Sequence, residues 1–175
     1  MTEKRTGKPP KRLAIIGKMG AGKSTVASLL KNRYGYKELA FATPIKEIAK
    51  NLFFMEKKDR ALLQDIGQAL RGVRDTVFVD YLIKNIPEDE AVIVSDVRQK
   101  NEYEALKKAG FIFVRINCDL NERIYRIEQR DGIVVDKVYM ERLNHISEND
   151  LDDVKADLEI NNSKRKDFLI GKKFD

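Results

Sequence analysis

The stretch Gly17-Lys-Met-Gly-Ala-Gly-Lys-Ser24 fits the pattern G-x-x-x-x-G-K-[ST] at every specified position. It follows a short apolar run, Leu13 to Ile16, and opens a segment, Lys23 to Arg33, with the periodicity of a helix. Gly20 and Gly22 leave room for backbone N–H groups to surround a phosphate, and a helix N-terminus adds partial positive charge. The stretch therefore predicts a phosphate-binding loop, or P-loop, between a buried strand and a helix. The structural alternative is a glycine-rich turn with a solvated lysine.

The residue types in and near the loop predict ATP and Mg²⁺ as cofactors. Lys23 would bridge the β- and γ-phosphates of ATP, and the Ser24 hydroxyl would bind Mg²⁺. Asp96 follows a second apolar run, Ala91 to Val94, and could approach the same Mg²⁺ through water. A loop-capping aspartate is the alternative for Asp96. The other loop residues expected to bind ATP are Gly17, Gly20, Ala21, Gly22 and Thr25.

Two absences from the sequence narrow the class of nucleotide-binding protein. Val97 stands where many P-loop ATPases carry a carboxylate that orients water, and the chain contains no guanine-reading Asn-Lys-x-Asp. Two functions remain: phosphoryl transfer to a bound acceptor, and nucleotide binding without catalysis.

Arginines favour phosphoryl transfer. Three of them lie at i, i+3 and i+7 of a predicted helix that ends at Gly132, and they are Arg123, Arg126 and Arg130. One basic helix face suits a lid that closes over ATP and stabilises the transferring group. Arg98 lies two residues beyond Asp96 and could hold an acceptor phosphate with both terminal nitrogens. The alternatives are a solvated helix face paired with neighbouring glutamates and, for Arg98, a surface ion pair.

The remaining pattern predicts one α/β domain of 175 residues. Apolar runs separated by helical stretches indicate a parallel sheet with helices on both faces. Thr43 before Pro44, Asp59 and Asp75 are predicted to cap three helices, and these form an insertion without strands at residues 43–86. The predicted strands are Leu13–Ile16, Ala91–Val94, Phe111–Ile116 and Leu158–Ile160.

Charge and composition indicate which partners to expect. The net charge is +6, but the positive excess lies in a basic tail at residues 1–11 and in residues 163–175. Because a duplex-binding domain concentrates positive charge on a folded face, we expect no nucleic-acid partner. No apolar run approaches the ~18 residues of a membrane span, and a single cysteine, Cys118, suits a reducing compartment. We expect a cytoplasmic protein, a monomer or homodimer, that acts on small molecules.

Further motifs accompany the P-loop, in the order Phe41-Ala-Thr-Pro-Ile-Lys-Glu47, Leu62-Leu-Gln-Asp-Ile-Gly67, Val94-Ser-Asp-Val-Arg98, Asn101-Glu-Tyr-Glu104 and His145-Ile-Ser-Glu148. Together they make most of residues 12–162 resemble the phage-type deoxynucleoside monophosphate kinases, within the P-loop nucleoside monophosphate kinase superfamily. Dephospho-coenzyme A kinases and animal-type phosphomevalonate kinases share much of this layout and remain the alternative.

The resemblance implies a three-layer α/β/α kinase that transfers phosphate from ATP to a (deoxy)nucleoside monophosphate, giving the diphosphate. Residues 43–86 would hold the acceptor, residues 123–142 would form the lid, and Asn161 and Asn162 would lie near adenine. An arginine shortly after Gly67 would hold the acceptor phosphate, and both Arg71 and Arg74 are candidates. The residues expected to bind the acceptor are Phe41, Gln64, Gln68, Arg71, Arg74 and Arg98. His145 is expected to be structural or to make a loop contact.

Overall fold

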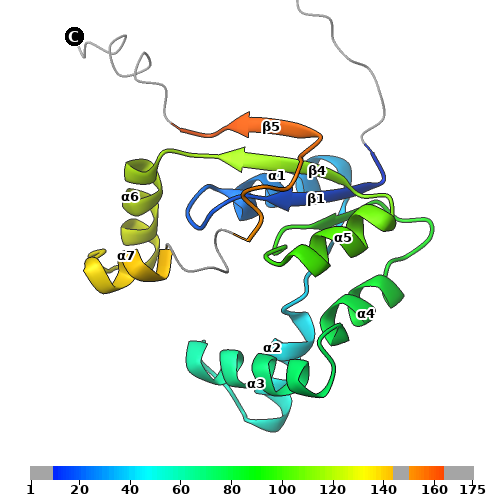
Figure 1. Ribbon diagram of the computed structural model, residues 1–175, viewed down its shortest axis with the longest axis horizontal. Helices are drawn as coiled ribbons and strands as arrows, with labels where there is room; N and C mark the ends of the chain where they lie inside the picture. The colour runs from blue at the N-terminus through cyan, green and yellow to red at the C-terminus, as the bar shows by residue number, and fades with distance from the viewer. Residues whose placement is uncertain (1–9, 144–149, 164–175) are drawn as a thin grey trace, which may run out of the picture.

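The computed structural model describes residues 10–143 and 150–163, and a five-stranded parallel sheet lies at its centre (Figure 1). The strand order is β2-β3-β1-β4-β5. The strands are β1 (Arg12–Ile16), β2 (Lys37–Leu39), β3 (Val92–Val94), β4 (Ile112–Asn117) and β5 (Leu158–Asn161). The helices are α1 (Lys23–Tyr34), α2 (Thr43–Leu52), α3 (Arg60–Val73), α4 (Val77–Lys84), α5 (Lys100–Lys108), α6 (Leu120–Asp131) and α7 (Lys137–Leu143).

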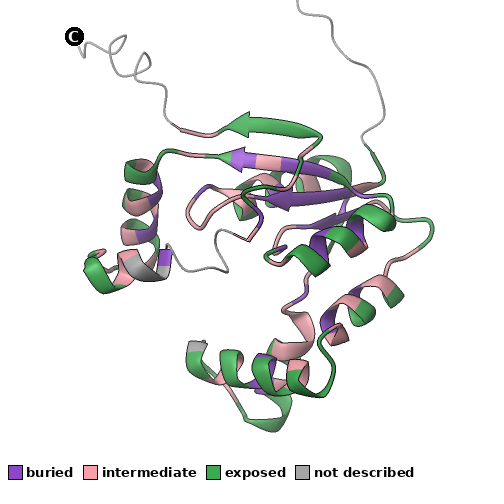
Figure 2. Cartoon of the chain, in the orientation of Figure 1, coloured by how far each residue is buried: buried purple, intermediate pink, exposed green. Residues whose placement is uncertain are grey.

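Both faces of the sheet are buried at its central strands, and β1 shows this most clearly (Figure 2). Leu13 and Ile15 belong to one core cluster together with Ala27 of α1. Ala14 and Ile16 belong to the opposite cluster, which side chains of α4 and α5 complete. A strand buried on both faces has no polar side to alternate with, so its sequence is a continuous apolar run. The predicted α/β fold, with helices on both faces of a parallel sheet, is confirmed.

The strand order places the P-loop at the carboxyl end of the central strand, β1. From β1 the chain passes first to β2 and β3 on one side, and later to β4 and β5 on the other. In open parallel sheets, ligands bind beyond the carboxyl ends of the strands, where the strand order reverses direction. Residues 17–22 follow β1 at this position, and α1 begins directly after them.

Most element boundaries agree with the sequence within one or two residues, but two predicted caps are wrong. Asp59 caps α3 as expected, because its Oδ1 accepts the Leu62 N–H at 3.0 Å. Ala42, not Thr43, is the N-cap of α2, and Thr76, not Asp75, is the N-cap of α4. Neither replacement residue makes a side-chain capping bond, so tertiary packing rather than local capping fixes where these two helices begin.

The sequence missed the edge strand β2. It has only three residues, Lys37–Leu39, and none of them is fully buried, so no apolar run marks it. Its parallel pairing with β3 defines it instead.

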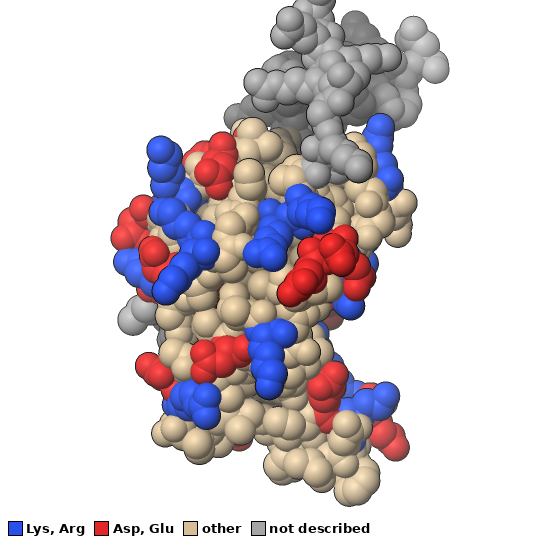
Figure 3. Space-filling model, turned by 90° about the vertical axis from the view of Figure 1, so that its right-hand side faces the viewer, with Lys and Arg blue, Asp and Glu red and all other residues tan. Residues whose placement is uncertain are grey.

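The surface of the described residues carries mixed charge on the face shown in Figure 3, where lysines and arginines alternate with acidic side chains. No helix within residues 10–143 and 150–163 has the length and apolarity to cross a bilayer. The motif His145–Glu148 and most of the two basic tails lie outside the described residues.

Candidate active site

The P-loop follows a path on which its glycines cannot carry a side chain. A Cβ on Gly17, where φ is +143°, would lie 2.4 Å from the backbone oxygen of Ile116 in β4. A Cβ on Gly20, where φ is +80°, would lie 2.7 Å from the backbone oxygen of Arg123 in α6. Both obstacles are backbone atoms of packed elements and cannot move aside. The loop therefore depends on glycine for close approach as well as for its dihedral angles.

Side chains from outside the loop bind its carbonyl groups. The Arg123 Nε donates to Met19 O at 2.7 Å, and the Asn162 Nδ2 donates to Ala21 O at 2.9 Å. The C=O and N–H of a trans peptide point in opposite directions, so these bonds direct the N–H groups of the following residues, Gly20 and Gly22, to the other side. The arrangement prepares an anion-binding concavity before any ligand arrives.

Lys23 curls back over the loop instead of extending into solvent. Its Nζ donates to Gly17 O and, at 3.2 Å, to Lys18 O. The next two residues of α1, Ser24 and Thr25, are exposed at the start of the helix. The ammonium and the two hydroxyl groups thus lie at the helix N-terminus, where a nucleotide phosphate would bind.

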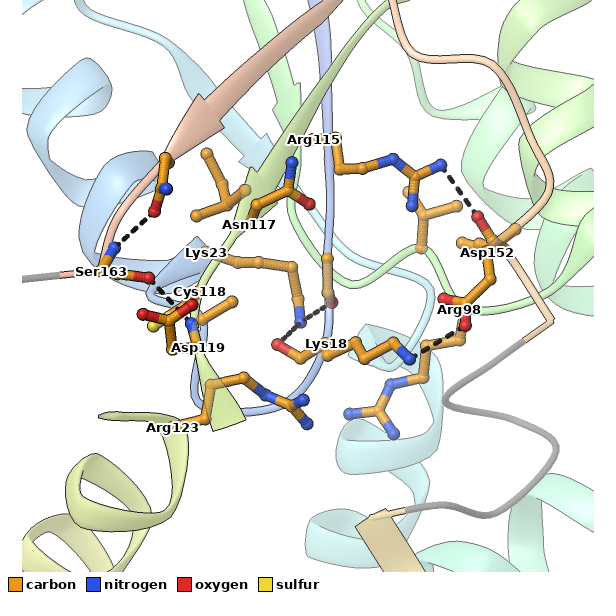
Figure 4. A pocket seen from close by; sticks show the side chains of 16 residues that line it. Lys18, Lys23, Arg98, Arg115, Asn117, Cys118, Asp119, Arg123, Asp152 and Ser163 are labelled. Atoms are coloured by element: carbon orange, nitrogen blue, oxygen red, sulfur yellow. Dashed lines mark hydrogen bonds and ion pairs between the residues drawn. The ribbon is translucent and has the colours of Figure 1, made fainter. Parts of the chain in front are cut away.

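A cavity of about 340 Å³ opens above the carboxyl ends of β1, β4 and β5, and we call it the strand-end cavity. Figure 4 shows Arg123 and Arg98 extending toward its mouth from opposite sides, with Lys18 and Lys23 between them. The polar and charged residues that line it include Lys18, Lys23, Arg98, Asn117, Asp119, Arg123, Asp152, Asn161 and Ser163.

A second cavity, of about 560 Å³, lies between the start of α1 and α2, and we call it the helix cavity. The polar and charged residues that line it are Lys23, Ser24, Thr25, Glu38, Lys46, Ser95, Asp96, Arg98, Arg126 and Arg130. Lys23 and Arg98 are the two residues that line both cavities. Two cavities that meet at a lysine and an arginine can hold two anionic molecules end to end.

Asp96 lies at the end of β3 and binds the segment that leads into α2. Its Oδ1 accepts the Phe41 N–H at 3.1 Å, and its Oδ2 accepts the Ala42 N–H at 3.0 Å. Burial raises the pKa of Asp96, while the two N–H groups and the neighbouring Arg98 act in the opposite direction. The carboxylate therefore ties the insertion to the sheet, in addition to the metal role that the sequence predicted.

The residues present fit an Mg²⁺ ion that is held largely by phosphate. Ser24 and Asp96 line the same cavity and offer oxygen ligands, which Mg²⁺ prefers. Each Asp96 oxygen accepts one N–H and keeps a second lone pair, enough for a metal-bound water. Within the described ranges, no cluster of three His, Cys, Asp or Glu side chains could hold a metal alone.

Glu102 positions the chain that carries Arg98. Its side chain is 3% exposed, and its Oε2 accepts the N–H groups of Arg98 at 2.8 Å and Gln99 at 3.1 Å. This is the acidic half of a capping box at the start of α5. Burial raises the pKa of Glu102, and the Arg71 guanidinium partly opposes that shift.

The three arginines of α6 differ from one another. Arg123 is 7% exposed and binds the P-loop through Met19. Arg126 donates to Asn162 O at 2.8 Å and pairs with Glu122 at 3.0 Å. Arg130 pairs with Asp131 through two bonds of 2.8 Å. The stripe faces the P-loop and its cavities, and Arg126 also makes the glutamate pair that the alternative interpretation proposed.

The acceptor residues predicted on α3 separate into two groups. Arg71 packs over the Phe78 ring at 4.8 Å and next to Gly67, whose missing Cβ would lie 3.3 Å from an Arg71 nitrogen. Arg74 is exposed and pairs with Asp80 at 3.3 Å. Gln64 and Gln68 are also exposed. None of the four residues lines the strand-end cavity or the helix cavity. Of this set, Arg71 alone lies close enough to Glu102 to influence its pKa.

Phe41 was predicted to bind the acceptor, but its side chain lies in the hydrophobic core. It is 4% exposed and belongs to the core cluster on the α4–α5 face of the sheet. An aromatic ring at the start of the insertion is buried because it anchors the following helix to the sheet. Its backbone N–H, bound to Asp96, is the part that faces the site.

Several lining residues were not singled out from the sequence. Asn161, which was predicted near adenine, lines the strand-end cavity together with Asn117, Asp119 and Ser163. Lys18 pairs there with Asp152 at 2.9 Å. Polar residues directly after an apolar strand are a usable signal for Asn117 and Asp119. Nothing local marks Asp152, which packing brings to the P-loop.

Comparison with known proteins gives three further findings. A family model described as an AAA domain matches residues 13–154. A protein of Acanthamoeba polyphaga mimivirus, named "Putative deoxynucleotide monophosphate kinase", is 28% identical over 142 residues, covering 60% of this chain and 72% of its own length.

Solved structures of kinases share the fold. A gluconokinase from Sinorhizobium meliloti 1021 superposes with a TM-score of 0.59 at 15% identity, over 91% of this chain and 86% of its own. A shikimate kinase from Acinetobacter baumannii, in complex with shikimate, superposes with a TM-score of 0.57 at 16% identity, over 90% of this chain and 87% of its own. At such identities the likeness concerns the arrangement of strands and helices.

Proposed function

Because the chain belongs to the AAA-domain family and is a P-loop kinase, we propose that it transfers the γ-phosphoryl group of ATP to a (deoxy)nucleoside monophosphate. The products are ADP and the nucleoside diphosphate. The acceptor class is supported by the motifs shared with deoxynucleoside monophosphate kinases and by the name of the mimivirus relative.

The observation that carries the proposal is the pair of cavities that meet at Lys23 and Arg98. A hydrolase needs one nucleotide site and a positioned water, whereas a kinase needs two sites that face each other across the transferring group. ATP would occupy the strand-end cavity, with its adenine near Asn161 and its phosphates in the P-loop. The acceptor would enter the helix cavity beside Asp96.

The reaction balances without a further co-reactant. An oxygen of the acceptor phosphate attacks the γ-phosphorus of ATP, and the bond from that phosphorus to the β–γ bridging oxygen breaks. The bond electrons remain on the bridging oxygen, which leaves as part of ADP. Lys23, Arg98 and the α6 arginines would offset the charge that spreads over the transferring group, as electrostatic stabilisation of this reaction requires.

Residues on each side would orient the two substrates. Arg71 and Arg98 would hold the acceptor phosphate, and Glu102 would fix the backbone of Arg98. Ser24 and Asp96 would hold Mg²⁺, the first directly and the second through water. When bound, Mg²⁺ supplies positive charge to the phosphate oxygens and orients them.

A product assay tests the proposal. Purified protein is incubated with ATP, Mg²⁺ and one acceptor at a time: each of the four deoxynucleoside monophosphates, phosphomevalonate or dephospho-coenzyme A. We expect a diphosphate product from at least one deoxynucleoside monophosphate and little ADP without an acceptor. Turnover confined to phosphomevalonate or dephospho-coenzyme A would change the substrate but keep the mechanism. ATP binding without product from any acceptor would support a non-catalytic module.

A further inference from the structure

The helix cavity is lined by a second lysine besides Lys23 of the P-loop. Lys46 lies in the first turn of α2 and lines this cavity together with Ser24, Asp96 and Arg98. It is close enough to Asp96 and Glu38 to influence the pKa of both carboxyl groups. Its position on the insertion, facing the P-loop, places a movable positive charge opposite the reacting phosphates.

The two carboxylates of the cavity are already bound by other groups. Glu38 accepts from Lys31 at 2.7 Å and from the Ser95 hydroxyl at 3.0 Å. Asp96 accepts the two backbone N–H groups that precede α2. Among the residues that the structure describes, no side chain makes an ion pair or hydrogen bond with the Lys46 ammonium.

Charge in the helix cavity is unbalanced toward the positive. Five cationic side chains line it, against the two carboxylates Glu38 and Asp96. Arg126 and Arg130 are paired with Glu122 and Asp131, but Lys46 has no such partner among the described residues. An excess of cations around a cavity favours an anionic occupant.

Helix stability does not account for Lys46. A cation in the first turn of a helix opposes the helix dipole, and the first turn of α2 contains no acidic residue to offset it. Lys50, one turn further along, lies in the last turn, where the dipole favours a cation. Both lysines are exposed, but only Lys46 lines the helix cavity, so the two form a matched pair that differs in position.

We propose that Lys46 binds the phosphate of the acceptor, opposite Arg98, and so makes the site selective for a phosphorylated acceptor. This inference rests on the proposed function, because it names a residue of the same acceptor site. A lysine can contact a phosphate oxygen as a point charge while an arginine binds two oxygens in a plane, so the two side chains complement each other.

The test compares Lys46→Met, Lys46→Arg and the control Lys50→Met in steady-state kinetics with the best deoxynucleoside monophosphate. Loss of one charged contact should raise the acceptor KM of Lys46→Met about 10- to 100-fold, with the KM for ATP within about twofold of wild type. Lys46→Arg should recover most of the loss, and Lys50→Met should match wild type. An unchanged acceptor KM, or an equal rise in the KM for ATP, would overturn the assignment.

A binding measurement separates failure of this inference from failure of the proposed function. Calorimetry follows inorganic phosphate binding in the presence of ADP, which occupies the P-loop. Weaker phosphate binding by Lys46→Met than by wild type and Lys50→Met supports the site even if no acceptor is turned over. Equal binding by all three proteins, alongside an active wild-type enzyme, would refute the role of Lys46 and leave the kinase function intact.

Discussion

The P-loop and the helical insertion are held to the protein in different ways. Side chains of α6 and of the segment after β5 bind the P-loop carbonyls, and neighbouring backbone excludes a Cβ from its glycines. The insertion, α2 to α4, is tied to the end of β3 by the two amides that Asp96 accepts. It also leaves large apolar side chains in solvent, including Phe54, which is 81% exposed.

This difference shows how the two halves of the site are built. The P-loop binds with backbone N–H groups, so its geometry must be fixed by close packing before a ligand arrives. The insertion offers side chains, chiefly Arg71 and Lys46, that come from separate helices and depend on how those helices are placed. Loss of the Lys23 ammonium should therefore affect turnover, loss of a side chain that braces the P-loop should affect stability, and loss of a cation of the insertion should affect acceptor binding.

The largest effect is expected from Lys23→Ala. The variant removes a positive charge from the β- and γ-phosphates, and loss of one such electrostatic contact typically costs about 100-fold or more in kcat. Folding should be nearly unchanged, because the bonds that Lys23 makes to Gly17 O and Lys18 O lie within one loop. A coupled assay of ADP release measures kcat, and a thermal melt measures stability. An active Lys23→Ala enzyme would contradict a P-loop kinase mechanism.

Arg126→Ala tests whether the P-loop depends on α6 for its stability. The variant loses a charge-assisted bond to Asn162 O and a weaker one to Ala21 O, so we expect a loss of about 2 kcal/mol in the free energy of unfolding. Urea denaturation measures it. Arg130→Ala is the matched control, because its exposed pair with Asp131 should contribute about 0.5 kcal/mol. Equal losses in the two variants would mean that the P-loop is not braced by Arg126.

Arg71→Ala should act on the acceptor alone. Loss of a charged contact to phosphate should raise the acceptor KM about 10-fold, equivalent to about 1.4 kcal/mol, with an unchanged KM for ATP. Arg74→Ala is the control at the C-cap of the same helix, since Arg74 is paired with Asp80 at the surface. Initial rates at varied acceptor concentration decide between the two arginines. A raised acceptor KM in Arg74→Ala with an unchanged one in Arg71→Ala would place the acceptor phosphate near Arg74, at the exposed end of α3.

The smallest effect concerns the insertion as a folded unit. Asp59→Ala removes the side-chain cap of α3 and should lower the free energy of unfolding by about 1 kcal/mol. Asp75→Ala serves as the control, because Thr76 and not Asp75 is the N-cap of α4. Chemical denaturation compares the two variants. The fall in kcat of Asp59→Ala can be expressed as an activation free energy. If it exceeds the loss in free energy of unfolding, α3 contributes to the chemistry as well as to binding.

Local patterns predicted much of this protein because local physics controls those parts. The glycine spacing of residues 17–24 and the apolar run before it were sufficient to place the P-loop after β1. Asp59 capped its helix as expected, because a capping bond spans only three residues. The edge strand β2 escaped prediction because its pairing with β3, not its composition, defines it.

The class of fold, the phosphate-binding loop and the candidate arginines can be predicted from the sequence, since each depends on residues that are neighbours along the chain. Tertiary structure alone decided that two cavities meet at Lys23 and Arg98, that Arg71 and not Arg74 turns toward Glu102, and that the Phe41 ring lies in the core. These features join side chains from elements far apart in the sequence. Their distances are set only when both faces of the sheet are packed, so no pattern along the chain records them.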